Sequence, residues 1–321
     1  MIAIDAMGGD HAPQVVVSGA LSAAKDNVPV MIFGPQALVK THLDQLDPTW
    51  QRYPIKVTDA PERIGMAENP VLSIRKKPTS SLVQAVRSVK DQQCRGVVSA
   101  GNSGAFMAAA SFILGRTENI ERPAILGLLP GLHGRVVGLD LGANTECRPQ
   151  HLYQFAHLGA DYAQHVLGIA NPRVGLLANG EEDEKGSALT KEVFGLLKQS
   201  NLNFVGNIEP YQIVVNKADV VVCDGFSGNI LIKTMESVHY MLAAYGKQEL
   251  TKLKDDACKQ AIASWGERFF SEIEDKFTGR PFGGAVLAGV NGRVVVCHGS
   301  ANEYDIKQAI MLAAARIVEK K

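Results

Sequence analysis

The sequence predicts an α/β protein with two lobes, three layers (α/β/α) and a mostly parallel sheet. Three observations support this class. Short apolar runs recur along the chain, each run ends in a loop of small polar residues, and helical patterns follow most of these loops. Strands that alternate with helices pair in parallel within a sheet. At 321 residues the chain exceeds the usual size of one compact unit, which predicts the two lobes.

The elements follow one another in a regular order. An alternating apolar run at residues 2–6 opens the chain and leads into two glycines. Further units of a strand and its loop are expected at 28–35, 95–105, 135–146, 173–186, 218–229 and 292–302. Helices are expected at 106–114, 189–197, 230–242 and 304–318, and another at Ser80 or Ser81.

Composition excludes several classes of protein. The 33 basic residues balance 33 acidic residues, so no general attraction to nucleic acid is expected. The five cysteines form no CxxC pair, which suits a reducing cytoplasm and gives no reason to expect a metal site. No leader-like segment and no run of about 18 apolar residues occurs, so a cytoplasmic protein is expected.

The glycine-rich and polar loops are the candidate binding site. Loops that leave the carboxyl ends of parallel strands gather on one edge of the sheet, where α/β proteins bind ligands. Several of these loops precede a helix, whose free N–H groups can face an anion. Turn chemistry alone would explain any single loop, whereas the whole set favours a shared polar cleft. The fingerprints GxGxxG, GxxxxGK[ST] and GxSxG are missing, so dinucleotide binding, P-loop chemistry and serine hydrolysis lose their usual support.

Seven segments carry a resemblance to a known family. In order they read AIDAMGGDHAP, IRKKPTSSL, VSAGNSGAFMA, LDLGAN, NGEEDEKG, ADVVVCDGFSGNILIK and HGSAN. Together they resemble the PlsX family of phosphate acyltransferases, which transfer a fatty acyl group from acyl carrier protein to inorganic phosphate. The resemblance runs from Ile2 to beyond Asn302.

The resemblance implies a fold like that of the isocitrate and isopropylmalate dehydrogenases and the phosphotransacetylases. It also implies a homodimer that works without a cofactor in glycerophospholipid synthesis, in the cytoplasm and in peripheral contact with the membrane. One catalytic unit would span residues 1–321. Its lobes would comprise residues 1–100 plus 280–321 and residues 101–279.

The chemistry of such a reaction suits these loops. The leaving group is a thiol with a pKa of about 8.5, which departs as thiolate with little acid assistance. Phosphate is already anionic and can attack the thioester directly. The enzyme therefore needs to bring two substrates together and to stabilise an oxyanion, without a nucleophilic triad.

Lys185 and Asn229 are the candidate catalytic residues. Lys185 is a lone cation after four acids and could neutralise phosphate or the oxyanion, although a solvated lysine would look the same. Asn229 offers an amide donor at a helix start, where a simple helix cap is the alternative. The substrate-binding candidates are Gly8, Gly9, Asp10, His11, Asn102, Ser103, Asn144, Glu181, Asp224, Gly225, Ser227, Gly228 and His298.

The acids and histidines among these candidates have open roles. Glu181 and Glu182 could orient Lys185 or carry a proton, but an acid pair beside phosphate would repel it unless turned away. His11 and His298 could exchange protons near neutral pH, or they could make structural hydrogen bonds.

A basic run is the candidate docking surface for the acidic carrier protein. It comprises Arg75, Lys76 and Lys77, and a solvated loop is the alternative.

Residues 250–277 place apolar side chains at helical spacing, as in a membrane-contacting helix or in a helix packed in a core or dimer. Their balanced charges favour packing over attraction to anionic lipid. The stretch 245–277 reads as shorter and more polar than the helical hairpin that the resemblance implies.

Three other functions are compatible with the sequence. A phosphotransacetylase would share the fold and take its acyl group from coenzyme A. A decarboxylating dehydrogenase would need nicotinamide and usually a divalent metal, for which the sequence has no dedicated fingerprint. A non-catalytic membrane-associated scaffold is disfavoured by the number of glycine-lined loops.

Overall fold

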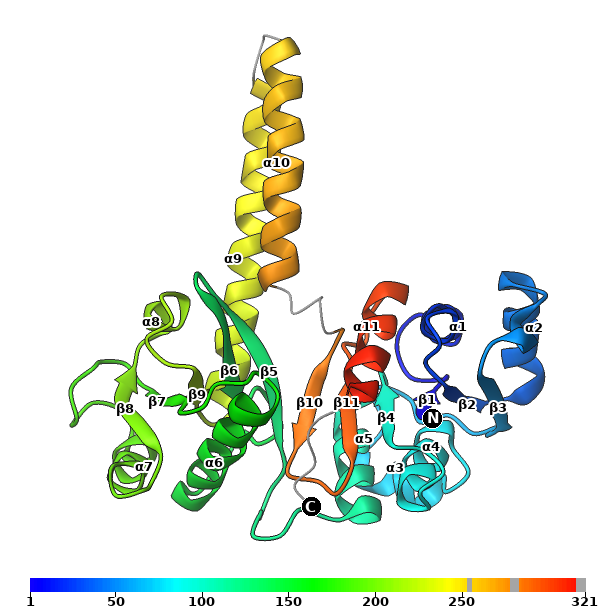
Figure 1. The fold of residues 1–321 in the computed structure, drawn as a ribbon, viewed down its shortest axis with the longest axis horizontal. Helices are drawn as coiled ribbons and strands as arrows, with labels where there is room; N and C mark the ends of the chain where they lie inside the picture. The colour runs from blue at the N-terminus through cyan, green and yellow to red at the C-terminus, as the bar shows by residue number, and fades with distance from the viewer. Residues whose placement is uncertain (253–255, 278–282, 316–321) are drawn as a thin grey trace.

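A twisted sheet of eleven strands forms the centre of the protein (Figure 1). The computed structural model describes residues 1–252, 256–277 and 283–315. The strands stand in the order β3-β2-β1-β4-β11-β10-β5-β6-β9-β7-β8. Their bounds are β1 (Ile2–Asp5), β2 (Val30–Gly34), β3 (Ile55–Asp59), β4 (Gly96–Ser99), β5 (Ala124–Gly131), β6 (Gly134–Leu139), β7 (Arg173–Leu177), β8 (Asn203–Ile208), β9 (Val220–Val222), β10 (Ala285–Ala288) and β11 (Arg293–Val296).

Two sets of parallel strands make up this sheet. The first set is β3, β2, β1, β4 and β11, and the second is β6, β9, β7 and β8. Between them, β10 and β5 pair antiparallel with each other and with their outer neighbours. The two sets therefore run in opposite directions. The expectation that all the carboxyl-end loops share one edge of the sheet is wrong. Apolar periodicity in the sequence predicts a strand but does not show in which direction that strand runs in the sheet.

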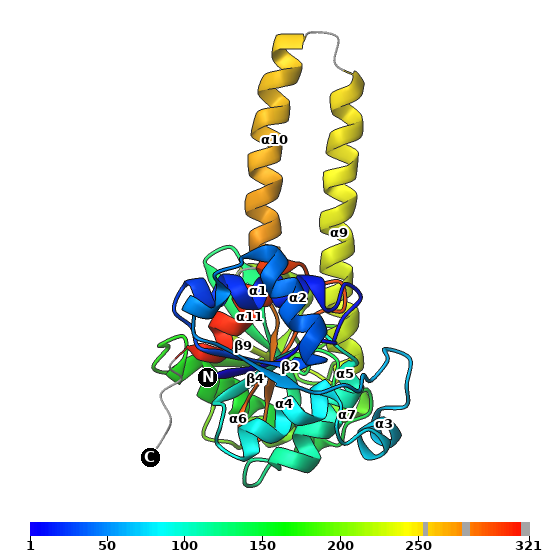
Figure 2. The ribbon, with the colours of Figure 1, turned by 90° about the vertical axis from the view of Figure 1, so that its right-hand side faces the viewer.

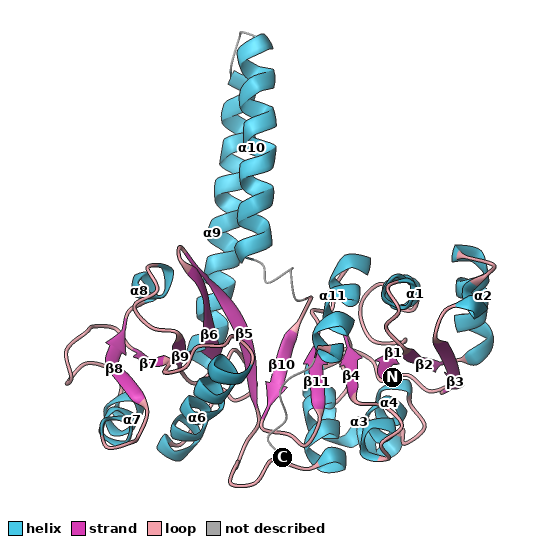
Figure 3. Ribbon diagram, in the orientation of Figure 1, coloured by secondary structure: helices cyan, strands magenta, loops and turns pink. Residues whose placement is uncertain are grey.

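Helices cover both faces of the sheet and complete three layers (Figure 3). Their bounds are α1 (Gln14–Lys25), α2 (Gln36–Leu46), α3 (Pro70–Lys76), α4 (Ser81–Lys90), α5 (Ser103–Ala109), α6 (Pro149–His165), α7 (Ala188–Lys198), α8 (Pro210–Val214), α9 (Gly225–Lys252), α10 (Asp256–Phe277) and α11 (Glu303–Ala314). The predicted α/β/α class with a mostly parallel sheet is confirmed.

The core follows the alternation of the strands. Ile2 and Ile4 of β1 pack with α1, α2 and α11, whereas Ala3 packs with α4 and α5 on the other face. In the second set, Val137 packs with α6 and α7, and Val136 packs with α8. Period-two patterning thus sorts each strand between two helical layers. The lobe boundaries predicted at residues 100/101 and 279/280 stay a prediction, and residues 280–282 and 316–321 lie outside the described chain.

Two predicted helices differ in detail. The helix expected at 106–114 begins earlier as α5 and continues as a π-helical turn over Ala110–Leu114. The helix expected at 304–318 is α11, and residues 316–318 lie outside the described chain. Ser80 caps α4 by accepting a hydrogen bond from Val83 N, which confirms the expected start.

A long helical hairpin, formed by α9 and α10, projects away from the sheet (Figures 1 and 2). α9 runs ten residues beyond the end expected at Leu242. On α10, Trp265 and Phe269 are 55% and 40% exposed. The interpretation of residues 250–277 as a core helix is therefore wrong, whereas the expectation that the hairpin is shorter than in the family stays a prediction. The side chains of residues 253–259 and 271–282 lie outside the described part of the chain. In the part that is described, no helix combines the length and hydropathy needed to cross a membrane.

Candidate functional site

The first group of candidate residues lies at the carboxyl ends of β1, β4 and β11. Gly8 is packed so closely that a Cβ there would lie 2.6 Å from Gly101 N. Asp10 N donates to Gly299 O over 2.8 Å, which ties the first loop to the last. His298, the neighbour of Gly299, places its Nδ1 2.8 Å from Ser300 Oγ. The structure thus brings together Gly8, Gly9, Asp10 and His298 from opposite ends of the chain.

A buried carboxylate that the sequence analysis missed lies beneath this group. Asp5 accepts hydrogen bonds from Ser81 Oγ (2.5 Å) and Ser99 Oγ (2.7 Å). Burial raises the pKa of Asp5, while both hydrogen bonds act in the opposite direction. The only sequence signal was an acid at the end of an apolar strand, which is also common in turns.

Asn102 serves the architecture of this group. Its Nδ2 lies 3.0 Å from Met66 O, 3.0 Å from Glu68 O and 3.3 Å from Gly65 O, and its Oδ1 accepts from Ala105 N at the start of α5. The Asn102 amide therefore holds residues 65–68, and its assignment as a substrate-binding residue stays a prediction. Ser103, the first residue of α5, and His11 are both exposed.

The second group lies at the carboxyl ends of β6 and β9. Asn144 O accepts a hydrogen bond from Gly225 N over 2.7 Å. A Cβ on Gly228 would lie only 2.0 Å from Asp140 O, and one on Gly142 would lie 3.7 Å from Asn229 Cβ. The loop after β6 and the first turns of α9 are therefore in direct contact. This contact brings together the candidate residues Asn144, Gly225, Gly228 and Asn229.

Asp224, not Asn229, caps α9. Its Oδ1 accepts from Ser227 N and its Oδ2 from Ser227 Oγ, both over 2.9 Å. Asn229 lies four residues inside the helix and its side chain is exposed. The alternative reading of Asn229 as a simple helix cap is therefore wrong.

Lys185 lies in the loop that follows β7, the neighbour of β9. Its backbone N donates to Glu182 O over 2.9 Å, and its side chain passes over Gly180, where a Cβ would lie 2.8 Å from Lys185 Cγ. Glu181 instead pairs with Lys217 Nζ over 2.7 Å, and this hydrogen bond lowers the pKa of Glu181. The suggestion that Glu181 orients Lys185 is therefore wrong, because the sequence does not show that Lys217 lies beside it.

The basic run divides into two parts. Arg75 and Lys76 are exposed in the last turn of α3. Lys77 Nζ, by contrast, lies 2.6 Å from Glu68 Oε1 and 2.8 Å from Arg63 O. Lys77 thus holds the segment that precedes α3, and the carrier-docking candidates reduce to Arg75 and Lys76.

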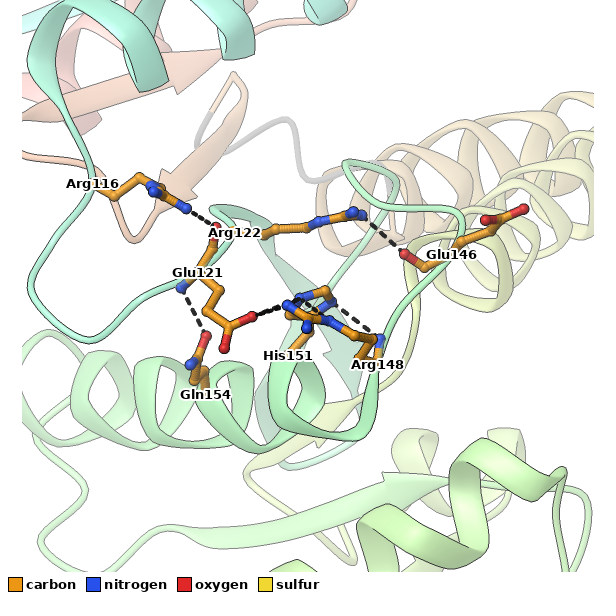
Figure 4. A network of polar contacts seen from close by, with 7 residues as sticks. All are labelled: Arg116, Glu121, Arg122, Glu146, Arg148, His151 and Gln154. Carbon is orange, nitrogen blue, oxygen red and sulfur yellow. Dashed lines mark hydrogen bonds and ion pairs between the residues drawn. The ribbon is translucent and has the colours of Figure 1, made fainter.

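A polar network braces the second group from the start of α6 (Figure 4). Glu121 accepts from Arg148, and its Oε2 lies 3.2 Å from Nε2 of the buried His151. Arg122 Nη1 donates to Glu146 O over 3.0 Å. Burial lowers the pKa of His151, which favours the neutral ring. The network connects residues 116–123 to the loop that carries Asn144. No motif in the sequence predicted this network.

The fold is one that other solved structures share. Solved structures with this fold include a phosphotransacetylase from Streptococcus pyogenes, with a TM-score of 0.61 and 19% identity over 98% of this chain and 93% of that chain. A branched-chain phosphotransacylase from Enterococcus faecalis gives a TM-score of 0.60 and 15% identity over 98% and 97% of the two chains. At these identities the likeness establishes the phosphotransacetylase type of α/β/α fold.

Sequence comparison gives the family. The model of the family described as "Fatty acid synthesis protein" matches residues 1–321, and the chain belongs to this family. Relatives include the phosphate acyltransferase of Desulforamulus reducens, 43% identical over 97% of this chain and 92% of the relative. The phosphate acyltransferase of Bacillus cereus is also 43% identical, over 96% and 92%. The chain is an enzyme of the acyltransferase class, and the resemblance noted in its sequence is confirmed.

Proposed function

We propose that this acyltransferase transfers a fatty acyl group from acyl carrier protein to inorganic phosphate, and that the acyl phosphate product enters glycerophospholipid synthesis. The observation that carries the proposal is the second group, where glycine-lined loops bring Asn144 against the start of α9 beside Asn229. The 43% identity to phosphate acyltransferases over nearly the whole chain supports the same activity.

The proposed step is a direct displacement. A phosphate oxygen forms a bond to the thioester carbonyl carbon, the carbonyl oxygen becomes an oxyanion, and the C–S bond then breaks to release thiolate, which takes a proton from solvent. Lys185 would neutralise phosphate or the oxyanion, and the Asn229 amide would donate to the oxyanion. No covalent intermediate on the enzyme is needed.

Sheet twist supports the participation of both groups. Four steps separate β11 from β9, and a twist of about 20–25° per step accumulates to roughly 90°. The carboxyl ends of the two parallel sets would lie at opposite edges of a flat sheet. In the twisted sheet they can therefore approach one corner of the molecule. We propose that the first group, with Gly8, Gly9 and His298, completes the substrate site there.

The assay that tests the function uses the purified full chain, long-chain acyl carrier protein and phosphate. Acyl phosphate is trapped as its hydroxamate. Product that requires both substrates is the expected result. Product from acyl-CoA but not from acyl carrier protein would favour the phosphotransacetylase alternative, and no product from either donor would contradict the proposal.

Reversal of charge at Arg75 and Lys76 tests the docking surface. We expect the variant Arg75→Glu/Lys76→Glu to raise KM for acyl carrier protein about tenfold or more, because like charges would face the acidic carrier. Turnover of a small acyl thioester should stay unchanged. Lys40→Glu/Lys90→Glu reverses two other exposed lysines and serves as the control. Equal losses with both donors would contradict the docking role.

We further propose that the hairpin joins two copies of the chain in a homodimer. The rings of Trp265 and Phe269 stack with centroids 4.8 Å apart and are both exposed, and Tyr240 and Met241 of α9 are 76% and 59% exposed. Exposed apolar side chains on a projecting arm favour burial against a partner. Peripheral membrane contact is the second use of the same surface.

Replacement of two aromatic residues of the hairpin by glutamate should distinguish dimer formation from membrane contact. We expect Trp265→Glu/Phe269→Glu to change a dimer into a monomer in light scattering, because charges would be buried in the interface. Ser264→Glu, at an exposed position of the same helix, should stay dimeric. A double variant that stays dimeric but no longer floats with liposomes would assign the surface to the membrane instead.

A further inference from the structure

Asp140 is a fully buried carboxylate at the carboxyl end of β6. Both of its carboxylate oxygens accept hydrogen bonds from N–H donors. Oδ1 accepts from the backbone N–H groups of Ile125 (3.0 Å), Gly142 (3.1 Å) and Ala143 (2.9 Å). Oδ2 accepts from Asn144 N (2.7 Å) and Asn144 Nδ2 (2.8 Å). One carboxylate thus sets the conformation of residues 142–144.

This constraint continues into α9. Asn144 O accepts from Gly225 N over 2.7 Å, and Asp140 O faces Gly228, where a Cβ would come within 2.0 Å. Asp140 N and Cys223 O are also joined, over 3.0 Å. The first turn of α9 therefore rests on residues whose positions depend on Asp140, and Asn229 is the next residue after Gly228.

We propose that Asp140 is a positioning residue for Asn229. It acts through Asn144 and the first turn of α9, and it does not itself touch the substrate. The inference rests on the proposed function of the Asn229 site. The inference gives a role to the buried Asp140 carboxylate, which takes no part in the proposed chemical step.

Asp140→Asn is the sharpest variant because the amide keeps the size of the carboxylate. Its oxygen can still accept from Ile125, Gly142 and Ala143, whereas its NH₂ group would face the two donors of Asn144. Donor would then oppose donor, and Asn144 would move away from Gly225. We expect kcat to fall on the order of a hundredfold, as for a catalytic group displaced by about 1 Å, with a smaller change in KM.

Asp219→Asn is the matched control. Asp219 lies before β9, at the opposite end of that strand from Asp224, and holds Arg173 through bonds of 2.8 to 3.0 Å. Its loss should reduce stability without lowering kcat. Equal losses of kcat in Asp140→Asn and Asp219→Asn would mean that the loss of any hydrogen-bonded carboxylate at these strands has this effect, and would overturn the inference.

A double-mutant cycle and hydrogen exchange complete the test. If Asp140 acts through Asn229, adding Asp140→Asn to Asn229→Ala should cost much less than the hundredfold seen alone. The Gly225 amide should also exchange faster in Asp140→Asn and, if that variant does not fold, in Asn144→Ala. Additive losses, or unchanged exchange at Gly225, would overturn the inference. Because exchange needs no turnover, it judges the inference even if the wild-type assay fails and the proposed function falls.

Discussion

Replacing Gly228 by alanine is expected to destabilise the protein by about 3 kcal/mol and to remove most of its activity. The new Cβ would lie 2.0 Å from Asp140 O, 2.9 Å from Cys223 Sγ and 3.0 Å from Asp140 C. Two of these atoms belong to the backbone and cannot rotate away, so α9 must shift, at the upper end of the usual cost of overpacking. Chemical denaturation and kcat measured on the same sample test both expectations.

Gly195→Ala is the matched control for this substitution. Gly195 lies within α7, and a Cβ there would meet no atom within 4 Å. Alanine should therefore stabilise the protein by about 0.4–1 kcal/mol through the lower entropy of the unfolded chain, with kcat unchanged. A Gly228→Ala variant that is as stable and as active as wild type would show that the contact between α9 and the β6 loop is looser than described.

Replacing Lys185 by methionine is expected to lower kcat about 10²–10³-fold, the usual effect of removing one group that stabilises an oxyanion. Methionine keeps the apolar part of the side chain, whose Cγ packs beside Gly180, and removes only the charge. The fold should be unaffected, because the Lys185 side chain is exposed. Steady-state rates at several phosphate concentrations separate a loss in kcat from weaker phosphate binding.

Lys198→Met is the matched control, because it removes a positive charge that pairs with Asp183 in the same acidic loop as Lys185. Lys198 Nζ lies 2.9 Å from Asp183 Oδ2, and the pair is exposed, so its loss should change stability by less than about 1 kcal/mol and leave kcat unchanged. Similar rates for Lys185→Met and wild type would instead identify Lys185 as a solvated lysine, the alternative that its sequence context left open.

Much of the site was visible in the sequence because its signals are local. A buried strand followed by Gly, Asn or Asp marks a loop at a carboxyl end, and this pattern located the loops of Gly8, Asn144 and Asn229. The same residues carried the family resemblance. The helix start at Ser80 or Ser81 was predicted because a capping hydrogen bond such as that of Ser80 reaches only three residues along the chain.

Contacts between distant residues could not be predicted in this way. Glu181 binds Lys217, thirty-six residues away, and Asn102 binds the carbonyl groups of residues 65–68. Asp5 and Asp140 read as ordinary turn acids until their partners are seen around them. Each of these roles depends on a partner residue that is distant in the sequence and adjacent only in the folded protein. The spacing of residues within one segment therefore cannot predict it.

The sequence alone therefore determined the α/β class, seven of the eleven described strands with the loops that follow them, and the family, because apolar periodicity and loop composition are properties of short segments. It did not predict β3, β5, β8 and β10. Only the tertiary structure decided that β10 and β5 reverse the sheet between two parallel sets, that α9 and α10 leave the core as a hairpin, and which carboxylates hold the loops. The physical reason is that strand direction, the partner of an apolar face and the partners of a buried charge are set by long-range packing.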